Sequence, residues 1–199
     1  MLIANAENRF VSRAEGKLEG AVSAFRYDFR NKTVLDIGSS TGGFTELALK
    51  LGAKKVYAVE KGTRQMKAPL RFDSRIELHE KTDFFDCVVA SDKGGVVLPK
   101  VDVVVADVSF VSLVKILRHA KQFVSAKTDL LVMLKPQFEA RPDQLWKGVV
   151  KNEKVRREII KNFEFALKRD GFLVLKKRDN DLAGRNGNLE RFYWLRLAK

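Results

Sequence analysis

Two apolar segments of the sequence are each followed by a side chain that can hold or move a proton. Asp107 directly follows VDVVVA, and Lys135 directly follows LLVML. Because neighbouring parallel strands end at the same edge of a sheet, an acid and a lysine at two strand ends would share one pocket mouth. Lys17 in the first predicted helix and Glu190 at the start of the last strand are candidates for the same cleft. A structural ion pair is the alternative interpretation.

A glycine-rich turn follows the first predicted strand, in the sequence Asp36-Ile-Gly38-Ser-Ser-Thr-Gly42-Gly43-Phe44. Glycines let the backbone turn tightly and approach a ligand closely, and the helix that follows offers free N–H groups. Asp36 is placed to take a ligand ammonium, directly or through water. The spacing differs from the GxGxxG of dinucleotide binders, which disfavours a dehydrogenase. A plain left-handed turn is the alternative.

Polar residues also follow the second and third predicted strands. Glu60 ends the second strand, where a carboxylate accepts hydrogen bonds from both hydroxyls of a ribose. Lys81-Thr82-Asp83 follows the third strand and is placed to meet an adenine edge. A solvated acid and an ordinary polar loop are the alternatives for each feature alone. Together with the glycine turn they indicate an adenosine-containing cofactor.

Apolar and amphipathic segments alternate along the chain and predict an α/β fold. We expect strands at residues 33–37, 55–59, 75–79, 101–106, 130–134, 172–176 and 189–197. We expect helices at 12–27 with Ser12 as N-cap, and at 43–51, 64–71, 112–124 and 152–168 with Asn152 as N-cap of the last. This alternation is typical of a mostly parallel sheet with helices on both faces. The last two strands have no helix between them and should pair antiparallel, giving seven strands with one reversed.

The composition limits the classes of protein that the chain can represent. Its 199 residues, 45% of them hydrophobic and 32% charged, suffice for one sizeable core. We expect a single domain over residues 1–199, with 1–30 a helical lead-in and 31–199 the core. No apolar run reaches the ~18–20 residues of a membrane span, and no signal peptide is evident. One cysteine, Cys87, and two distant histidines exclude a disulfide and predict no metal site, as in a reduced cytoplasmic protein.

The charge of the chain is strongly positive. With 38 Lys and Arg against 25 Asp and Glu, the net charge is +13. This excess favours a polyanionic partner, either nucleic acid or an anionic membrane surface, and a merely solubilising charge is the alternative. Trp146, Tyr193 and Trp194 lie in or near the basic C-terminal part, where they would form an RNA face or, alternatively, belong to the core.

Several motifs together resemble those of the ribosomal RNA methyltransferases of the TlyA type, within the wider FtsJ-like group. They are Phe10-Val-Ser-Arg13 with Lys17, LDIGSSTGGFT, ADVSF, and LKPQFEA with Gly148-Val-Val-Lys-Asn152. The resemblance covers the chain from about Arg9 to its C-terminus. It implies a Rossmann-like class I methyltransferase fold, S-adenosyl-L-methionine as cofactor, and methylation of a ribose 2′-hydroxyl in ribosomal RNA.

The resemblance also implies a catalytic tetrad. FtsJ-like enzymes use Lys-Asp-Lys-Glu, for which this chain offers Lys17, Asp107, Lys135 and Glu190. Lys135 would be the base for the ribose hydroxyl, Asp107 would hold the lysine ammoniums, and Glu190 would orient one of them. Positioning and electrostatic pre-organisation would supply most of the acceleration, because the methyl donor is already activated.

In the cofactor pocket, the resemblance implies that Asp36 faces the methionine end, Glu60 the ribose and Asp83 the adenine, while the glycine turn gives close backbone approach. The predicted cofactor-binding residues are Asp36, Gly38, Ser40, Gly42, Gly43, Phe44, Glu60, Lys61, Thr82, Asp83 and Asp107.

Other methyl acceptors and other functions fit the sequence less well than methylation of a ribose hydroxyl. Asp107-Val-Ser-Phe110 lacks the prolines typical of base-amino methylation. Cys87 precedes the fourth strand and is interpreted as a small buried hydrophobe, which disfavours carbon methylation. A cofactor- and RNA-binding module without catalysis is the alternative from another class. Family members are often named haemolysins, so a membrane-active protein is a third hypothesis, although no amphipathic arm is evident.

The family's members usually carry an N-terminal S4-like RNA-binding module, and this sequence begins almost at the catalytic domain. Either the sequence is a trimmed piece, or the domain finds RNA through its own basic surface. The expected partner is ribosomal RNA or a ribosomal subunit, with no membrane partner, and the oligomeric state is left open.

Overall fold

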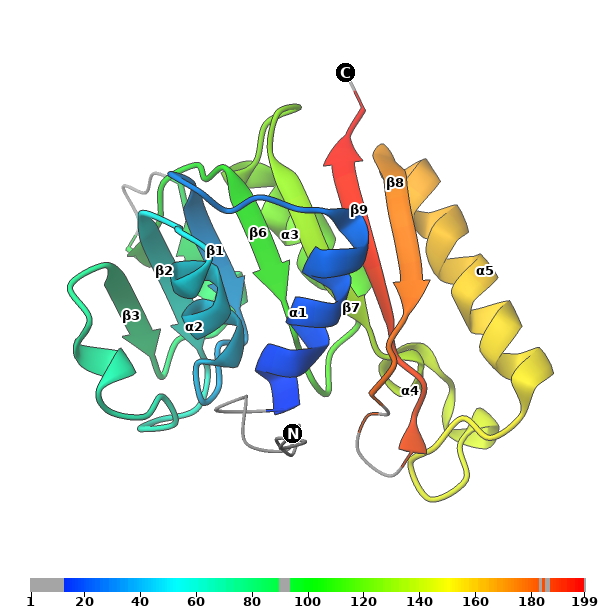
Figure 1. Ribbon diagram of the computed structural model, residues 1–199. Coiled ribbons are helices and arrows are strands. Elements are labelled where there is room, and N and C mark those ends of the chain that lie inside the picture. Colours follow the sequence, from blue (N-terminus) through cyan, green and yellow to red (C-terminus); the bar gives the residue numbers. More distant parts are fainter. Residues whose placement is uncertain (1–12, 90–93, 183, 185–186, 199) are drawn as a thin grey trace, which may run out of the picture.

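The carboxyl ends of parallel strands meet at one edge of a seven-stranded sheet (Figure 1). The computed structural model describes residues 13–89, 94–182, 184 and 187–198. The strand order is β3-β2-β1-β6-β7-β9-β8. In this sheet β9 alone runs in the direction opposite to the other six strands. The strands are β1 (Thr33–Ile37), β2 (Lys55–Glu60), β3 (Ile76–Glu80), β6 (Val103–Ala106), β7 (Asp129–Leu134), β8 (Phe172–Asp179) and β9 (Arg191–Leu197). The prediction of seven strands with one reversed is confirmed.

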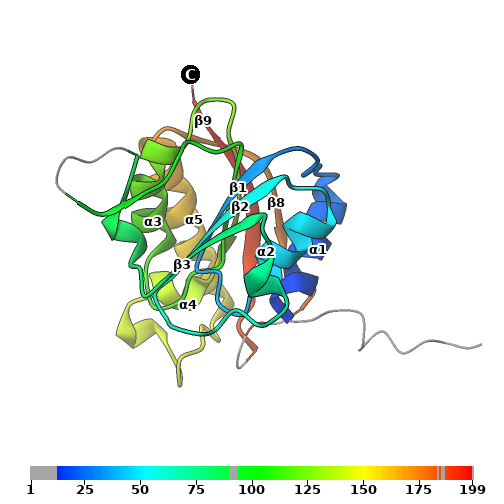
Figure 2. The same ribbon diagram turned by 90° about the vertical axis from the view of Figure 1, so that its left-hand side faces the viewer.

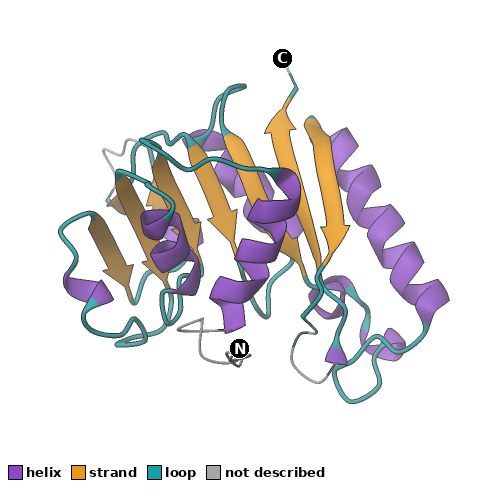
Figure 3. Cartoon of the chain, viewed as in Figure 1, coloured by secondary structure: helices purple, strands orange, loops and turns teal. Residues whose placement is uncertain are grey.

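Helices cover both faces of this sheet (Figures 2 and 3). On one face lie α1 (Arg13–Phe25) and α2 (Gly43–Lys50), and on the other lie α3 (Leu113–Ala120) and α5 (Glu153–Arg169). Short elements that the sequence patterns do not predict are the helix α4 (Pro136–Glu139), the paired strands β4 (Cys87–Val88) and β5 (Val96–Val97), and 3₁₀ turns at Phe84–Asp86 and Pro142–Gln144. None of the described helices combines the length and the apolar character that a bilayer crossing requires.

Strand β6 shows why a central strand of this fold is apolar throughout. Val103 and Val105 point into the core beneath α1 and α2, while Val104 and Ala106 point into the core beneath α3 and α5. Side chains alternate between the two faces of a strand, so a strand covered on both faces needs apolar residues at every position. All four residues are fully buried.

The predicted helix over residues 64–71 is wrong. The structure has only a 3₁₀ turn at Leu70–Phe72 in this region. Arg64 adopts a left-handed conformation with φ 53°, and Pro69 disfavours helical geometry in the residue before it. Both features interrupt a segment whose apolar spacing alone resembles a helix. The predicted N-cap Ser12 lies outside the described residues.

The register of the sheet brings residues that are far apart in sequence to one edge. Leu134 at the end of β7 pairs with Arg191 at the start of β9, so the next residues outward are Lys135 and Glu190. β1 and β6 end at the same edge, with Ile37 paired to Ala106. The lower side of Figure 1 is this carboxyl edge, where α4 and the loops on either side of it also lie.

The predicted N-cap of α5 gives a direct test of local stability. Asn152 accepts hydrogen bonds from Lys154 N at 2.9 Å and Val155 N at 3.4 Å. Asn152→Ala should lower the free energy of unfolding by about 1 kcal/mol, because two N–H groups of the first turn lose their acceptor. Urea unfolding measures this effect. Asn162→Ala, the same change at an exposed site within the helix, should cause no loss, and equal losses in the two variants would contradict the capping role.

Candidate active site

A cavity of about 910 Å³ opens at the carboxyl ends of β1, β2 and β6. This volume is typical of a site for a small organic ligand. Of the predicted cofactor residues, Gly38, Ser40, Glu60, Lys61, Thr82, Asp83 and Asp107 line it. The sequence analysis assigned no role to other lining residues, among them Gln65, Phe85, Ser109 and Phe110. The structure thus brings seven of the eleven predicted residues to one cavity.

The glycine turn after β1 forms one wall of the cavity. Gly38 has φ 80°, a left-handed conformation that favours glycine, and a Cβ there would lie 3.3 Å from the backbone oxygen of Asp107. Gly42 has φ 95° at the start of α2, against the side chains of Met66 and Leu70. The backbone of this turn therefore passes very close to the end of β6. A side chain at Gly38 would separate the two strand ends that frame the cavity.

Asp36 lies behind the glycine turn and has no exposed surface. Its Oδ2 accepts a hydrogen bond from the Thr45 hydroxyl at 2.6 Å, whereas Oδ1 has no hydrogen-bond partner among the described residues. Burial, together with repulsion from Asp107 and Glu60, raises the pKa of Asp36 to about 7. Asp36 is absent from the cavity lining, so the predicted contact with a ligand ammonium requires a path through the turn.

Glu60 ties the loops of β1 and β2 together beneath the cavity. Its Oε2 accepts a hydrogen bond from Ser40 N at 2.8 Å, and its Oε1 accepts one from Gly62 N at 2.6 Å. Gln65 Nε2 also donates to Oε1, at 3.3 Å, so Oε2 is the oxygen that keeps acceptor capacity toward the cavity. A ribose hydroxyl can use that capacity.

Asp83 and Lys61 form an ion pair in the lining of the cavity. Lys61 Nζ lies 2.8 Å from Asp83 Oδ2, and Asp83 Oδ1 accepts a hydrogen bond from Phe85 N. Both contacts lower the pKa of Asp83 and fix its carboxylate as a local cap. Thr82 is held through its hydroxyl, which donates to the Glu80 backbone oxygen at 3.1 Å.

Phe44 is a core residue in the structure, although the sequence analysis placed it in the cofactor pocket. It is 2% exposed, and its ring lies 6.0 Å from that of Phe192 in the core beneath α1 and α2. Gly42 and Gly43 contribute backbone to the turn and the first residue of α2, and neither lines the cavity. Phe44 is the second residue of α2, and its side chain points from the helix toward the sheet rather than into the cavity.

The four residues of the predicted tetrad form two ion pairs. Lys135 Nζ lies 2.6 Å from Asp107 Oδ1, and Lys17 Nζ lies 2.5 Å from Glu190 Oε2. All four side chains are largely buried, between 3% and 18% exposed. Asp107 is therefore the partner of one lysine rather than of both, and Glu190 orients Lys17 rather than Lys135. The strand register places the two pairs at neighbouring strand ends.

The motifs ADVSF and LKPQFEA are linked by side-chain contacts beyond the Lys135–Asp107 pair. Lys135 Nζ also donates to the Ser109 hydroxyl at 2.9 Å, and the rings of Phe110 and Phe138 lie 5.1 Å apart. Glu139 accepts hydrogen bonds from the hydroxyl of Ser112 at 2.7 Å and from the backbone N–H that follows it at 2.6 Å, which caps the start of α3. The two motifs thus contact each other through an ion pair, a hydrogen bond and a ring contact, and Glu139 extends the contact to the residues just after ADVSF.

The cavity is acidic in a protein whose net charge is +13. Glu60, Asp83 and Asp107 line it, and the carboxyl group of Asp36 lies behind the turn. Carboxylates attract a cationic ligand, and S-adenosylmethionine carries both an ammonium and a sulfonium charge. The partnerless Asp36 Oδ1, the free acceptor capacity of Glu60 and the close backbone at Gly38 fit such a ligand.

The strand order, the reversed β9 and the cavity at the carboxyl ends of the strands define a Rossmann-like class I methyltransferase fold. The family model of the FtsJ-like methyltransferases matches residues 10–197. The chain belongs to this family, and its cofactor is S-adenosylmethionine.

Similar proteins include named RNA methyltransferases and a protein with a haemolysin name. The chain is 34% identical over 196 residues to the 16S/23S rRNA (cytidine-2′-O)-methyltransferase TlyA of Mycobacterium tuberculosis, covering 98% of this chain and 71% of that protein. It is 36% identical to YqxC of Bacillus subtilis, provisionally named an rRNA methyltransferase, covering 92% of this chain and 64% of that protein. A solved structure from Lactococcus lactis, provisionally named a hemolysin, superposes with a TM-score of 0.87 at 35% identity, covering 95% and 89% of the two chains.

The buried Asp36 predicts an unusual dependence of stability on pH. Its pKa is about 7 in the folded protein and near 3.8 when exposed, so rising pH ionises the unfolded chain first and lowers the free energy of unfolding between about pH 4 and 7. Asp36→Asn cannot ionise. Its stability advantage over the wild type should grow through this window, reach up to about 4 kcal/mol, and stay constant above pH 7.

Urea unfolding at several pH values measures this difference. Asp102→Asn is the matched control, because hydrogen bonds from the backbone and side chain of Thr33 lower the pKa of Asp102. It should be less stable than the wild type at neutral pH, with a gap that closes in acid. If the difference in the free energy of unfolding between Asp36→Asn and the wild type did not change with pH, the carboxyl group of Asp36 would be ionised in the folded protein throughout this range.

Proposed function

We propose that this protein transfers a methyl group from S-adenosylmethionine to a ribose 2′-hydroxyl of ribosomal RNA. The observation that carries the proposal is the Lys135–Asp107 ion pair, which joins a proton-handling group to the rim of the cofactor cavity. The related M. tuberculosis protein is named for the same reaction on cytidine in 16S and 23S rRNA.

The cofactor supplies an electrophilic methyl group on a sulfonium, so the protein has to position and deprotonate the acceptor. In this proposal Lys135 Nζ, in its neutral amine form, takes up the proton of the 2′-hydroxyl while the ribose oxygen bonds to the methyl carbon. The methyl–sulfur bond breaks in the same step, and S-adenosylhomocysteine is the leaving group. The Asp107 carboxylate at 2.6 Å then stabilises the lysine ammonium, and the Ser109 hydroxyl at 2.9 Å fixes its direction. Positioning of this kind supplies much of the barrier reduction when the donor is already activated.

The Lys17–Glu190 pair holds a second lysine at the same edge of the sheet. Glu190 is 2% exposed, and its carboxylate would overlap a Cβ at Gly184, so the loop before β9 encloses it closely. A buried ion pair of this kind holds both side chains in one geometry, because removal of either partner leaves an uncompensated charge. Lys17 thereby offers a fixed positive charge at the edge where the acceptor ribose and its phosphates would bind.

Phe110 is the residue of this edge best suited to hold the acceptor nucleotide. Its side chain is 89% exposed although it lines the cavity, and its backbone has the left-handed φ of 63°. Such a conformation is strained for a bulky residue and is found where function requires it. Phe138 supports the ring from one side, which leaves the other face free to stack on a base.

Loss of the proposed base provides the first test. Lys135→Ala should lower methyl transfer by roughly 10²–10⁴-fold, the usual range for a general base, while the affinity for S-adenosylmethionine stays within a few fold. The assay uses methyl-labelled cofactor and ribosomal subunits that lack ribose methylation, with digestion of the product to nucleosides.

Label in a 2′-O-methyl nucleoside with the wild type, lost in Lys135→Ala, is the expected outcome. Thermal unfolding of both proteins controls for a loss of fold. Unchanged turnover in a folded Lys135→Ala would refute the assigned role. Cofactor binding by the wild type without any labelled product would instead favour an RNA-binding module without catalysis.

The proposed stacking role of Phe110 gives a second test. Phe110→Ala should reduce kcat/KM for RNA by roughly 5- to 150-fold, because base–aromatic stacking contributes about 1–3 kcal/mol. Phe110→Tyr keeps the ring and should retain most activity. Phe72→Ala, which removes an aromatic ring that is 77% exposed outside the cavity, should have no effect. Equal activity of Phe110→Ala and the wild type would exclude the stacking role.

A further inference from the structure

A tight hairpin after α4 projects from the carboxyl edge of the sheet. Trp146 N donates to Val149 O at 2.9 Å, and Val149 N donates to Trp146 O at 3.0 Å. The two residues between them are left-handed, Lys147 with φ 47° and Gly148 with φ 79°. Two consecutive positive φ values define the primed turn that closes a two-residue hairpin. The backbone of this hairpin is therefore fixed locally.

Asn188 fastens the hairpin to the segment that carries Glu190. Asn188 is 4% exposed, its Nδ2 donates to Gly148 O at 3.1 Å, and its Oδ1 accepts from Val150 N at 3.3 Å. Glu190 follows two residues later and holds Lys17. The hairpin thus has a fixed position relative to the proposed catalytic residues.

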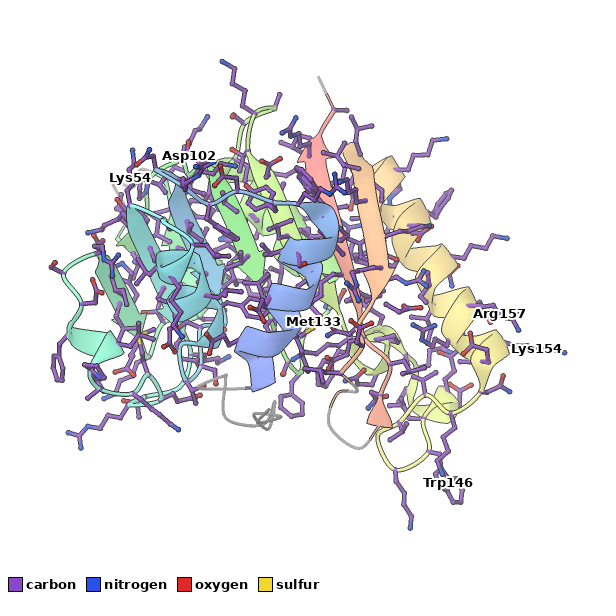
Figure 4. All side chains as sticks on the ribbon, viewed as in Figure 1. Lys54, Asp102, Met133, Trp146, Lys154 and Arg157 are labelled. Atoms are coloured by element: carbon purple, nitrogen blue, oxygen red, sulfur yellow. The ribbon has the colours of Figure 1, made fainter. Side chains whose placement is uncertain are left out.

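The hairpin presents a large aromatic ring to solvent. Trp146 is 60% exposed, and Figure 4 shows it at the extreme of the carboxyl edge, below the first turn of α5. The other two aromatic residues of the predicted RNA face behave differently, since Tyr193 is fully buried and Trp194 is half-buried with its indole N–H bonded to Asp129. Of these three aromatics only Trp146 is free to contact a partner.

Three lysines belong to the hairpin tip, the residues that follow it and the start of α5. Lys151 Nζ lies 5.7 Å from the Trp146 ring centre, Lys147 occupies the hairpin tip, and Lys154 lies in the first turn of α5. Within the part of the chain that the structure describes, these three lysines form no ion pair with a carboxylate. Cations near the N-terminus of a helix oppose its dipole, a cost that an anionic partner offsets.

We propose that Trp146, Lys147, Lys151 and Lys154, here called the hairpin surface, bind unpaired RNA that flanks the acceptor nucleotide. Trp146 stacks on a base and the lysines contact phosphates, the combination by which proteins bind single-stranded nucleic acid. This inference rests on the proposed function, because it requires an RNA acceptor at the same edge. A protein partner fits less well, since an anchoring tryptophan in a protein interface needs apolar surroundings and lysines are depleted there.

Intrinsic fluorescence tests the hairpin surface without any methyl transfer. The chain has two tryptophans, so the emission that Trp146→Phe lacks belongs to the exposed indole. Titration with a short single-stranded oligocytidylate should quench this emission, and a duplex of equal length should quench it much less. Trp146→Ala should weaken binding roughly 5- to 150-fold. Phe165→Ala, an exposed aromatic about three turns along α5, is the matched control and should bind like the wild type.

The salt dependence of RNA affinity distinguishes the contribution of the lysines from that of the Trp146 ring. Lys151→Gln and Lys154→Gln should each reduce the slope of log K against log[salt] by about 0.7, the value for one phosphate contact on a single strand, and Trp146→Ala should leave the slope unchanged. With ribosomal subunits, Trp146→Ala should raise KM while kcat and cofactor affinity stay constant.

Wild-type affinity in Trp146→Ala, or an equal loss in Phe165→Ala, would overturn the proposal. So would unchanged salt slopes in both lysine variants, which keep the test decisive if Trp146→Ala fails to fold. Saturable binding of ribosomal proteins, lost in Trp146→Ala while oligocytidylate binding is retained, would assign the surface to a protein. A wild type that binds oligocytidylate through Trp146 but transfers no methyl group would refute the proposed function and leave the surface assignment intact.

Discussion

The ion pair between Lys135 and Asp107 joins the ends of β6 and β7, and the architecture of the site depends on it. Two adjacent parallel strands deliver one residue each, so the pair forms only in the observed register. The following turns add the Phe110–Phe138 contact and the cap that Glu139 provides to α3. The position of an exposed aromatic ring, the direction of a lysine and the start of a helix are thus set together. A change in one motif would displace the other.

The distribution of charge separates the two ligands that a methyltransferase of this kind must bind. The chain as a whole carries +13, yet three carboxylates and one lysine line the cavity, and a fourth carboxylate lies behind the glycine turn. Two of the lining carboxylates are paired with lysines, so the net negative charge of the cavity is small. The basic surface attracts a polyanion, whereas the excess of carboxylates in the cavity favours a cationic cofactor. Mutual repulsion among these carboxylates contributes to the raised pKa of Asp36. The same concentration of acids that favours the cofactor therefore destabilises the fold at neutral pH.

The strands of the sheet and most of the helices could be predicted from the sequence. The spacing of apolar residues, every second residue in a strand or about every 3.6 residues in a helix, is a local pattern that each element carries in its own sequence. The sequence was also sufficient for Asp107 and Lys135, since both directly follow strands whose ends must meet. Lys17 and Glu190 were brought together by the family resemblance rather than by spacing, because 173 residues separate them and no local pattern encodes that separation. The helix expected over residues 64–71 failed for the opposite reason, as Arg64 and Pro69 override a suitable apolar spacing. The assignment of Phe44 to the cofactor pocket stays a prediction; its side chain points into the core, and the neighbouring Gly42 and Gly43 do not line the cavity either.

The parts of the chain that depart from regular α/β alternation gather at one edge. α4, the hairpin at Trp146 and the loop before β9 all lie at the carboxyl ends of the strands (Figure 1). Buried polar side chains join the hairpin to the segment before β9 and that segment to α1. Asn188 and Glu190 are both nearly inaccessible, and each bonds a segment more than 30 residues away in sequence. Buried hydrogen bonds are directional, so they fix the orientation of an edge that has no core of its own. Regular packing of helices on the sheet supplies the stability of the fold, and these few polar contacts determine the geometry with which it meets its substrates.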